Sequence, residues 1–522
     1  MFERDGRERF WAEGEDTWDL IVVGGGITGA GILREAARAG IRALLLERGD
    51  FAGGTSSWSS KLVHGGLRYL ASGDWRLTRE SVRERQALMR AAPGLVEPLT
   101  FLLPMYAGAR PGRLAMGAAL KVYDWMAGLH YSHYLDRESA RWRVPSLADD
   151  DLNGAYAYLD ARTDDVRLVL RVLAEAVADG ATALNRVSAE SLLVEGDKVT
   201  GVRARDGVTG AAAELRAPVV INATGPWADG LRAGVEAPPR LRPLRGSHFV
   251  FDFARLPMAQ ALTLFHPRDR RPLFAFPWEG TTVFGTTDLD HEGWPDRPAC
   301  MTPEEADYLV EGLTHYFPSL GLGREHALCS YSGVRPVVGG GAENPSDESR
   351  ESAIWDERGL LTVTGGKLTT YRVTALEALA AARDRLPGTP RLDGRAPILR
   401  PAPPARPGEA RLAGRYGDDY TRMRETLPAT DFAAVPGSVS VWAELRWALR
   451  HEAVVGLDDL LLRRTRLGLL LPRGGAALLD DIGALCRAEL GWDAARRERE
   501  REAYLAHWRS AHAVPAGTGD AV

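Results

Sequence analysis

The chain has 522 residues, enough for two or three domains rather than one small core. Its hydrophobic fraction of 45% and charged fraction of 26% are those of an ordinary globular protein. The net charge of −5, without a block of basic residues, argues against a nucleic-acid partner. Three cysteines, Cys300, Cys329 and Cys486, lie far apart without metal-ligand spacing, so we expect no metal site. This low cysteine content is compatible with a protein that works in a reducing compartment.

A βαβ unit is predicted near the N-terminus. Residues 20–23 form a short apolar run of the kind that a buried parallel strand needs. Residues 27–39 suit a helix, and a second apolar run at 43–46 ends in Glu47. Two later segments, 218–225 and 360–367, repeat the pattern of a strand followed by glycine. We therefore expect one doubly wound α/β domain that is assembled from three separated stretches of the chain.

The rest of the chain divides around that domain. We expect the discontinuous dinucleotide-binding domain at 18–100, 155–237 and 345–385, and an inserted α+β substrate or cap domain at 101–154 and 238–344. Seven prolines between 387 and 407 resist both helix and central strand, which predicts a linker at 386–407. Beyond it, residues 441–470 and 476–508 favour helices, so we expect an all-helical domain at 408–522.

The turn after the first strand carries a dinucleotide-binding pattern. Gly24 allows a sharp turn, Gly26 lets the backbone approach a pyrophosphate, and Gly29 lets the helix pack on the strand. The start of the helix offers free N–H groups and a partial positive charge to the phosphates. Glu47, at the end of the second strand, can accept hydrogen bonds from ribose hydroxyls. This context makes the pattern much more specific than a lone glycine motif.

Three further contacts favour FAD over NAD. A hydroxyl-rich loop with Thr55, Ser56 and Ser57 follows Glu47 closely and could wrap an extended dinucleotide. The later strand that ends in Ala223, Thr224 and Gly225 could bring another backbone to the same cofactor. Residues 365–367 would place a third helix N-terminus near the ring system, where its positive end favours negative charge on a flavin.

The chain resembles the FAD-dependent glycerol-3-phosphate dehydrogenases over about residues 18–510. The motifs that carry the resemblance keep their order and spacing, and residues 444–467 with Arg463-Arg464-Thr465 are similar to the family's helical C-terminal domain. The other motifs are 54–70 (GTSSWSSKLVHGGLRYL), 222–227 (NATGPW), 246–248 (GSH), 285–288 (GTTD), 331–336 (YSGVRP) and 365–372 (GGKLTTYR). The resemblance implies FAD as the cofactor and adds Ser60, Lys61, His64, Gly66, Gly366, Leu368 and Thr369 to its expected neighbours.

The resemblance also implies a reaction, in which sn-glycerol 3-phosphate becomes dihydroxyacetone phosphate, FAD takes the hydride and a quinone reoxidises it. A phosphate dianion requires cationic donors, and Arg68 and Arg335, with Lys367, lie in motifs that the family directs at the flavin. His248 is the best candidate base for the hydroxyl proton, although Arg335 or a bound water could also manage it. Hydrogen bonds that orient the substrate are expected from Tyr69, Thr287 and Asp288.

Other functions remain open at this point. An oxidase of the same substrate would pass electrons to oxygen, and an amine or amino-acid oxidase would bind a carboxylate instead of a phosphate. A non-catalytic flavin-binding assembly or sensor protein would not need His248, Arg68 and Arg335 together. We favour the quinone-linked dehydrogenase, because no long insertion of the kind associated with the oxidases is present.

The protein is expected to be cytoplasmic, with peripheral contact at the inner face of the cytoplasmic membrane. The first twenty residues have no apolar stretch of a signal peptide, and no run of about 18 apolar residues predicts a spanning helix. Residues 114–129, flanked by Arg110 and Arg113, could form an interfacial helix or a buried helix of the cap domain. The oligomeric state stays open, and a homodimer is compatible with the sequence.

Overall fold

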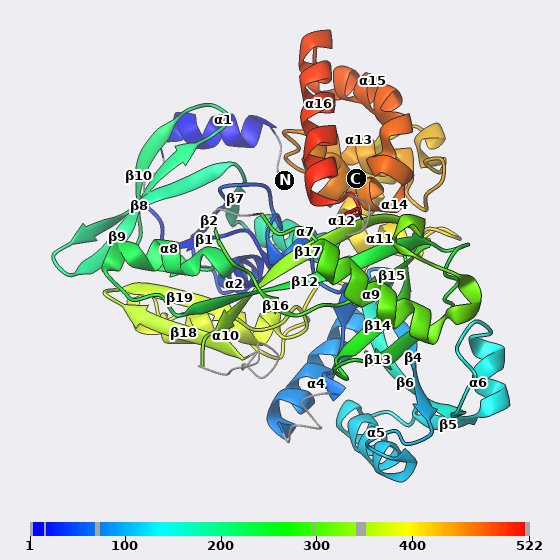
Figure 1. The fold of residues 1–522 in the computed structure, drawn as a ribbon. Coiled ribbons are helices and arrows are strands. Elements are labelled where there is room, and N and C mark those ends of the chain that lie inside the picture. The colour runs from blue at the N-terminus through cyan, green and yellow to red at the C-terminus, as the bar shows by residue number, and fades with distance from the viewer. Residues whose placement is uncertain (1–3, 15–16, 68–73, 296–297, 341–350, 517–522) are drawn as a thin grey trace.

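A computed structural model describes residues 4–14, 17–67, 74–295, 298–340 and 351–516 (Figure 1). Six strands form the first sheet, in the order β18 (Ser352–Glu357), β19 (Leu360–Gly365), β11 (Val219–Asn222), β1 (Leu20–Val23), β2 (Ala43–Leu46) and β7 (Thr182–Leu184). Neighbouring strands are parallel except for the antiparallel edge pair β18 and β19. The prediction of one parallel sheet built from three separated stretches is therefore confirmed.

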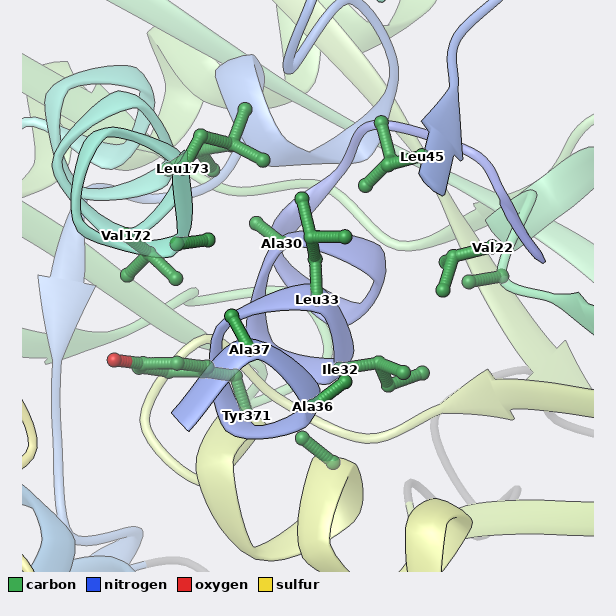
Figure 2. Packing of buried hydrophobic residues seen from close by; sticks show 14 of the residues in the cluster. Val22, Ala30, Ile32, Leu33, Ala36, Ala37, Leu45, Val172, Leu173 and Tyr371 are labelled. Atoms are coloured by element: carbon green, nitrogen blue, oxygen red, sulfur yellow. The ribbon is translucent and has the colours of Figure 1, made fainter. Parts of the chain in front are cut away.

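The two faces of this sheet have different covers. Helices α2 (Ile27–Arg38), α7 (Asp165–Ala178) and α10 (Tyr371–Ala381) pack on one face. Figure 2 shows α2 in the centre of this layer, with Leu33 and Ala37 close to the side chains of α7 and α10. The structure adds a three-stranded antiparallel sheet on the other face, formed by β8 (Val187–Glu195), β9 (Lys198–Asp206) and β10 (Ala212–Arg216). Side chains of α1 (Arg4–Glu13) pack against this three-stranded sheet.

A ten-stranded sheet forms the second large layer. Its strands are β3 (Leu62–Val63), β4 (Val96–Tyr106), β5 (His133–Asp136), β6 (Leu152–Thr163), β12 (Leu241–Asp252), β13 (Ala261–Phe265), β14 (Pro272–Trp278), β15 (Thr281–Gly285), β16 (Leu289–Asp290) and β17 (Ala327–Val338). Its helices are α4 (Trp75–Ala91), α5 (Arg113–Ala127), α6 (Arg137–Arg143) and α9 (Pro303–Tyr316). β4 and β6 run across the boundaries expected near residues 100 and 154, and the domain limits stay a prediction.

The C-terminal region is helical and lies at one end of the molecule (Figure 1). Residues 386–409, which include the linker expected at 386–407, contain no helix or strand. The region expected at 441–470 is broken, because Ala453 and Arg466 adopt positive φ angles of 50° and 63°. Gly491, with φ of 68°, ends the next helix. The helices are α11 (Ala410–Tyr416), α12 (Asp418–Thr426), α13 (Trp442–His451), a π-helical segment at Asp459–Arg464, α14 (Leu467–Leu470), α15 (Leu479–Leu490) and α16 (Ala494–Ala511).

Shorter elements complete the described chain. α8 (Ala228–Arg232) follows β11, and 3₁₀ segments lie at Thr55–Ser57, Gly225–Trp227, Ala233–Val235, Pro318–Leu320, Arg324–His326, Arg383–Arg385 and Ala429–Phe432. The segment Pro472–Leu478 is kinked, because Arg473, Gly474 and Gly475 have positive φ angles. Across the described residues, no helix has both the length and the apolar character that a membrane crossing would require.

Replacing Gly29 by alanine should destabilise the protein, because a Cβ at this position would overlap the carbonyl oxygen of Gly24. Overpacking of this kind costs about 1–3 kcal/mol in the free energy of unfolding. Gly6 in α1 provides the control, since a Cβ there meets nothing and alanine favours a helix. We expect Gly29→Ala to melt at a lower temperature than the wild type in circular dichroism, and Gly6→Ala to melt no lower. Equal melting of Gly29→Ala and the wild type would contradict this packing.

Candidate active site and cofactor cavity

A cavity of about 930 Å³ lies at the carboxyl ends of the parallel strands β1, β2, β11 and β19. This is where open α/β sheets bind ligands, and the volume is at the upper end of the ~300–1,000 Å³ range of ligand sites. Ten residues predicted from the sequence line it together: Gly24, Gly26, Glu47, Thr55, Ser56, Ala223, Gly225, Gly366, Lys367 and Leu368. The structure therefore brings together stretches of the chain as far apart in sequence as Gly24 and Leu368.

The glycine turn has no room for a side chain at its first glycine. Gly24 has φ of +112°, and a Cβ on it would lie 2.5 Å from the carbonyl oxygen of Ala223. Gly29 does not line the cavity but lets α2 approach the turn. The Ile27 N–H, at the start of α2, donates to Ser56 Oγ at 2.9 Å. A bare turn, a helix start and a hydroxyl loop in one wall fit the pyrophosphate of FAD.

Glu47 lies at the end of β2, as the sequence predicts. Its two carboxylate oxygens accept hydrogen bonds from Gly25 N–H and Gly49 N–H, each at 2.7 Å. Burial raises the pKa of Glu47, while these two backbone donors oppose the rise. Glu47 thus holds the glycine turn and also presents a carboxylate to the cavity, where a ribose hydroxyl of FAD can donate to it.

Several expected cofactor neighbours instead support the wall of the cavity from behind. Ser57 Oγ donates to the carbonyl oxygen of Ala52 at 2.6 Å. Thr369 Oγ1 donates to the carbonyl oxygen of His64 at 3.2 Å, which ties two predicted motifs together. Gly66 is buried with φ of +76°. Ser57, Thr369, His64 and Gly66 are not among the residues that line the cavity.

Lys61 also lies behind the wall rather than in it. Its ammonium group is fully buried and lies 3.1 Å from an oxygen of Asp165, the first residue of α7. It also donates to the carbonyl oxygen of Ser57 at 2.9 Å. Burial lowers the pKa of Lys61 to about 8, and Asp165 opposes that shift. Its place in the structure is a buried ion pair, which the sequence alone does not reveal because Asp165 is 104 residues away.

His248 and Arg335 share one face of the paired strands β12 and β17. The register places Tyr331 opposite His248, Gly333 opposite Gly246, and Arg335 one pair further along the same face. A Cβ on Gly246 would overlap the Arg335 guanidinium, so this glycine makes room for the arginine. Gly333 is covered in the same way, since a Cβ on it would overlap the backbone of Trp58.

The environment of His248 keeps its imidazole neutral. His248 is 1% exposed, stacks on Tyr331 with ring centres 4.6 Å apart, and lies 2.9 Å from Ser60 Oγ through Nε2. Burial, then the positive charges of Arg335 and Lys61, hold the pKa of His248 well below its usual range. Ser59, next to Ser60, lines the cavity, so His248 lies directly behind the cavity wall.

Arg335 is oriented by the turn that follows β15. One guanidinium nitrogen donates to Asp288 Oδ1 at 2.7 Å and the other to Thr286 Oγ1 at 3.3 Å. Thr287 is buried and uses its hydroxyl inside the protein, where it donates to Glu305 Oε1 at 2.6 Å. Asp288 and Thr287 therefore position the site in this structure. Arg68 and Tyr69, the other expected substrate contacts, lie outside the described residues.

Sequence reasoning missed Glu305. This fully buried carboxylate accepts from Thr287 and Ser247 with one oxygen and from Arg245 and the Thr302 N–H with the other. It ties α9 to β12 and to the turn that carries Asp288. The Thr302-x-x-Glu305 capping box was a visible local signal of the helix start, but it points to a helix and not to this role.

Three residues of the C-terminal region also line the cavity without having been predicted. Asp458, Arg463 and His507 lie in its wall near Glu47 and Arg186. Arg463 belongs to a motif that the sequence singles out, but nothing in the motif itself indicates which domain it contacts.

Comparisons with known proteins agree with this geometry. Residues 19–406 match the family model of FAD dependent oxidoreductases, and residues 406–497 match the model of the C-terminal domain of alpha-glycerophosphate oxidase. The chain is 34% identical over 484 residues to the aerobic glycerol-3-phosphate dehydrogenase of Bacillus subtilis (strain 168), with 86% of this chain and 87% of the relative covered. It is 37% identical over 376 residues to the protein of that name from Staphylococcus epidermidis (strain ATCC 12228 / FDA PCI 1200), with 71% and 67% covered.

Among solved structures, the glycerol-3-phosphate dehydrogenase from Bacillus halodurans complexed with FAD is similar with a TM-score of 0.78 and 28% identity, and 98% of each chain is covered. The L-alpha-glycerophosphate oxidase from Mycoplasma pneumoniae, with a TM-score of 0.58 and 16% identity over 74% of this chain and 100% of its own, shares the fold. With the cavity, the glycine turn and the matched family models together, the chain belongs to the FAD-dependent glycerol-3-phosphate dehydrogenase family within the FAD-dependent oxidoreductases.

Proposed function

We propose that this chain oxidises sn-glycerol 3-phosphate to dihydroxyacetone phosphate with FAD and passes the electrons to a quinone. The observation that carries the proposal is the shared face of β12 and β17, which brings neutral His248 and cationic Arg335 together behind the cavity wall. Membership of the family supports the substrate, since the relatives are named for it.

His248 is the group that takes the hydroxyl proton. Bound FAD would supply the acceptor for the hydride of the alcohol carbon. If Nε2 donates to Ser60, Nδ1 carries the free lone pair, and among the described residues this buried nitrogen has no hydrogen-bond partner. The lowered pKa leaves the imidazole in the unprotonated form, which is the form that can accept a proton.

Arg335 is the group that binds the phosphate. Its guanidinium is held at one side by Asp288 and Thr286, which fixes the plane of the fork and leaves 24% of the side chain exposed. A planar, permanently charged fork suits a phosphate dianion better than a mobile ammonium group does. Lys367, in the cavity wall near the predicted flavin position, adds a second positive charge.

One end of the molecule is suited to peripheral contact with a membrane. Leu114 and Trp125, about three turns apart in α5, are 88% and 72% exposed, and Trp142 in α6 is 79% exposed. The opposite face of α5 is buried, as expected for a helix of the cap domain, and membrane contact through its exposed face is our proposal. Exposed basic residues in or next to these two helices include Arg110, Arg113, Lys121, Arg141 and Arg143. Apolar tips with basic flanks are typical of interfacial helices, and this end lies away from the C-terminal helices (Figure 1).

Through this end, the protein would work on the inner face of the cytoplasmic membrane, where a quinone is within reach. A homodimer remains compatible with the structure and stays a prediction.

Replacing His248 by alanine should slow reduction of the bound flavin by glycerol 3-phosphate roughly 10²–10⁴-fold, the usual contribution of a general base. The measurement is the anaerobic loss of flavin absorbance after rapid mixing. His133 on β5 is exposed, and His133→Ala should react like the wild type. If His248→Ala were reduced at a near-normal rate with its flavin content unchanged, the proton acceptor would be another group.

The electron acceptor can be tested with the same preparation. With glycerol 3-phosphate as donor, we expect reduction of a soluble quinone analogue to be much faster than formation of hydrogen peroxide in air. The two rates are followed by quinone absorbance and by a peroxidase-coupled assay. Stoichiometric peroxide with little quinone reduction would favour an oxidase instead.

Membrane contact should depend on the apolar tips of α5. Trp125→Glu should lower the fraction of protein that sediments with anionic lipid vesicles, because a carboxylate opposes burial in the interface. Val208, exposed between β9 and β10, gives the control Val208→Glu, which adds the same charge elsewhere. Binding of the wild type should survive moderate salt, since the net charge of −5 gives little general attraction to anionic lipid. Equal sedimentation of both variants would place the contact elsewhere.

A further inference from the structure

Three arginines at the end of the π-helical segment are buried almost completely. Arg464 and Arg466 are 0% exposed and Arg463 is 8% exposed. A buried guanidinium is stable only when its charge is paired and its N–H groups are bonded. These arginines belong to the C-terminal helical region, yet their main carboxylate partners, Asp50 and Asp165, belong to the stretches that build the cofactor cavity.

The first contact is with the loop that follows β2. Arg464 binds Asp50 through two parallel hydrogen bonds of 2.6 and 2.8 Å, and Arg463 Nε donates to the same carboxylate at 2.5 Å. Asn185 Nδ2 adds a further bond of 3.0 Å. Burial alone would raise the pKa of Asp50, but Arg464 and Arg463 hold it well below its usual range. Asp50 is three residues after Glu47, so the loop that carries the ribose acceptor is fixed from behind.

The second contact is with the loop that carries Thr55 and Ser56. Arg466 donates to the carbonyl oxygen of Ser57 at 2.8 Å and to Asp165 at 2.9 Å. Asp165 also accepts from Ser59 Oγ at 2.7 Å. Arg466 therefore binds the backbone of this loop directly at Ser57. It is also linked to Ser59 through the carboxylate of Asp165, which both residues contact.

The same region reaches the cavity itself. Arg463 lines it, together with Asp458 and His507, beside Glu47 and Arg186. His507 Nδ1 lies 3.5 Å from Asp458, so α16 contributes to the same wall. The glycine turn and Glu47 mark this wall as the adenosine side of the cavity.

We infer that the C-terminal helical region is part of the FAD site, and that its arginines 463, 464 and 466 couple FAD binding to docking of that region on the two cofactor loops. Binding that requires the docked arrangement stabilises it in return, because linkage between two equilibria is reciprocal. The inference rests on FAD as the cofactor and is independent of the substrate and acceptor proposed above.

The first test uses the full-length wild type with and without FAD. Hydrogen exchange of backbone amides should slow on FAD addition in residues 442–511 as well as around the glycine turn. Protease should cut the apoprotein faster than the FAD-bound protein within residues 386–409. Unchanged exchange in 442–511 would overturn the inference, whatever the activity of the enzyme.

The second test compares two arginines that each link the C-terminal region to the rest of the chain. Arg464→Gln removes the pair with Asp50, whereas Arg411→Gln removes a partly buried pair with Glu279 that does not reach the cofactor loops. We expect Arg464→Gln to weaken FAD binding about tenfold or more, measured by titration of the apoprotein with FAD fluorescence. Arg411→Gln should bind FAD like the wild type even if it melts at a lower temperature.

Equal weakening by both variants would show a general loss of stability and overturn the specific coupling. If Arg464→Gln did not fold, Arg463→Gln would replace it. In that variant Asp50 would still be paired with Arg464. Wild-type affinity for FAD in a folded Arg463→Gln or Arg464→Gln variant would likewise contradict the inference.

Discussion

Asp165 is fully buried at the start of α7, and the pairing of its carboxylate organises the centre of the molecule. A buried carboxylate without partners would carry a desolvation penalty that exceeds most single interactions in a protein. Lys61 and Arg466 supply positive charge, and the Ser59 hydroxyl supplies a further donor. Because these partners come from the loop after β2 and from the C-terminal region, one charge fixes three parts of the chain against each other.

The loop at 55–61 contacts both the cofactor cavity and His248, so its fixed position orients both. Thr55 and Ser56 form part of the cavity wall, while Ser60 bonds the ring of His248. Thr55 Oγ1 also donates to the carbonyl oxygen of Val334 on β17, the strand that carries Arg335. The position of the cofactor and the position of the acid–base group are therefore set by one short segment, and a shift of that segment would disturb both.

The strands of the parallel sheet, the glycine turn and the position of Glu47 could be predicted from local sequence patterns. Each pattern lies within the roughly thirty residues of a βαβ unit or at the end of a single strand. His248 and Arg335 could be predicted as site residues only from the motifs that contain them. That they share one face becomes visible only in the pairing of β12 with β17. Lys61 and Glu305 could not be assigned in this way, since Asp165, Arg245 and Thr287 reach them from other elements. The order of strands in the ten-stranded sheet likewise follows from long-range packing that no local pattern contains.

The sheet topology has a consequence for how the chain is made. β1 lies beside β11, with Leu20 opposite Val219, and β11 lies beside β19, with Val220 opposite Leu360. The partners of Asp50 are 413 and 414 residues further along the chain. At translation rates of about 5–20 residues per second, the first βαβ unit waits on the order of tens of seconds for these partners. During that interval a nascent chain exposes an apolar strand edge, so ribosome-associated chaperones and slow, late closure of the nucleotide pocket are expected features of its biogenesis.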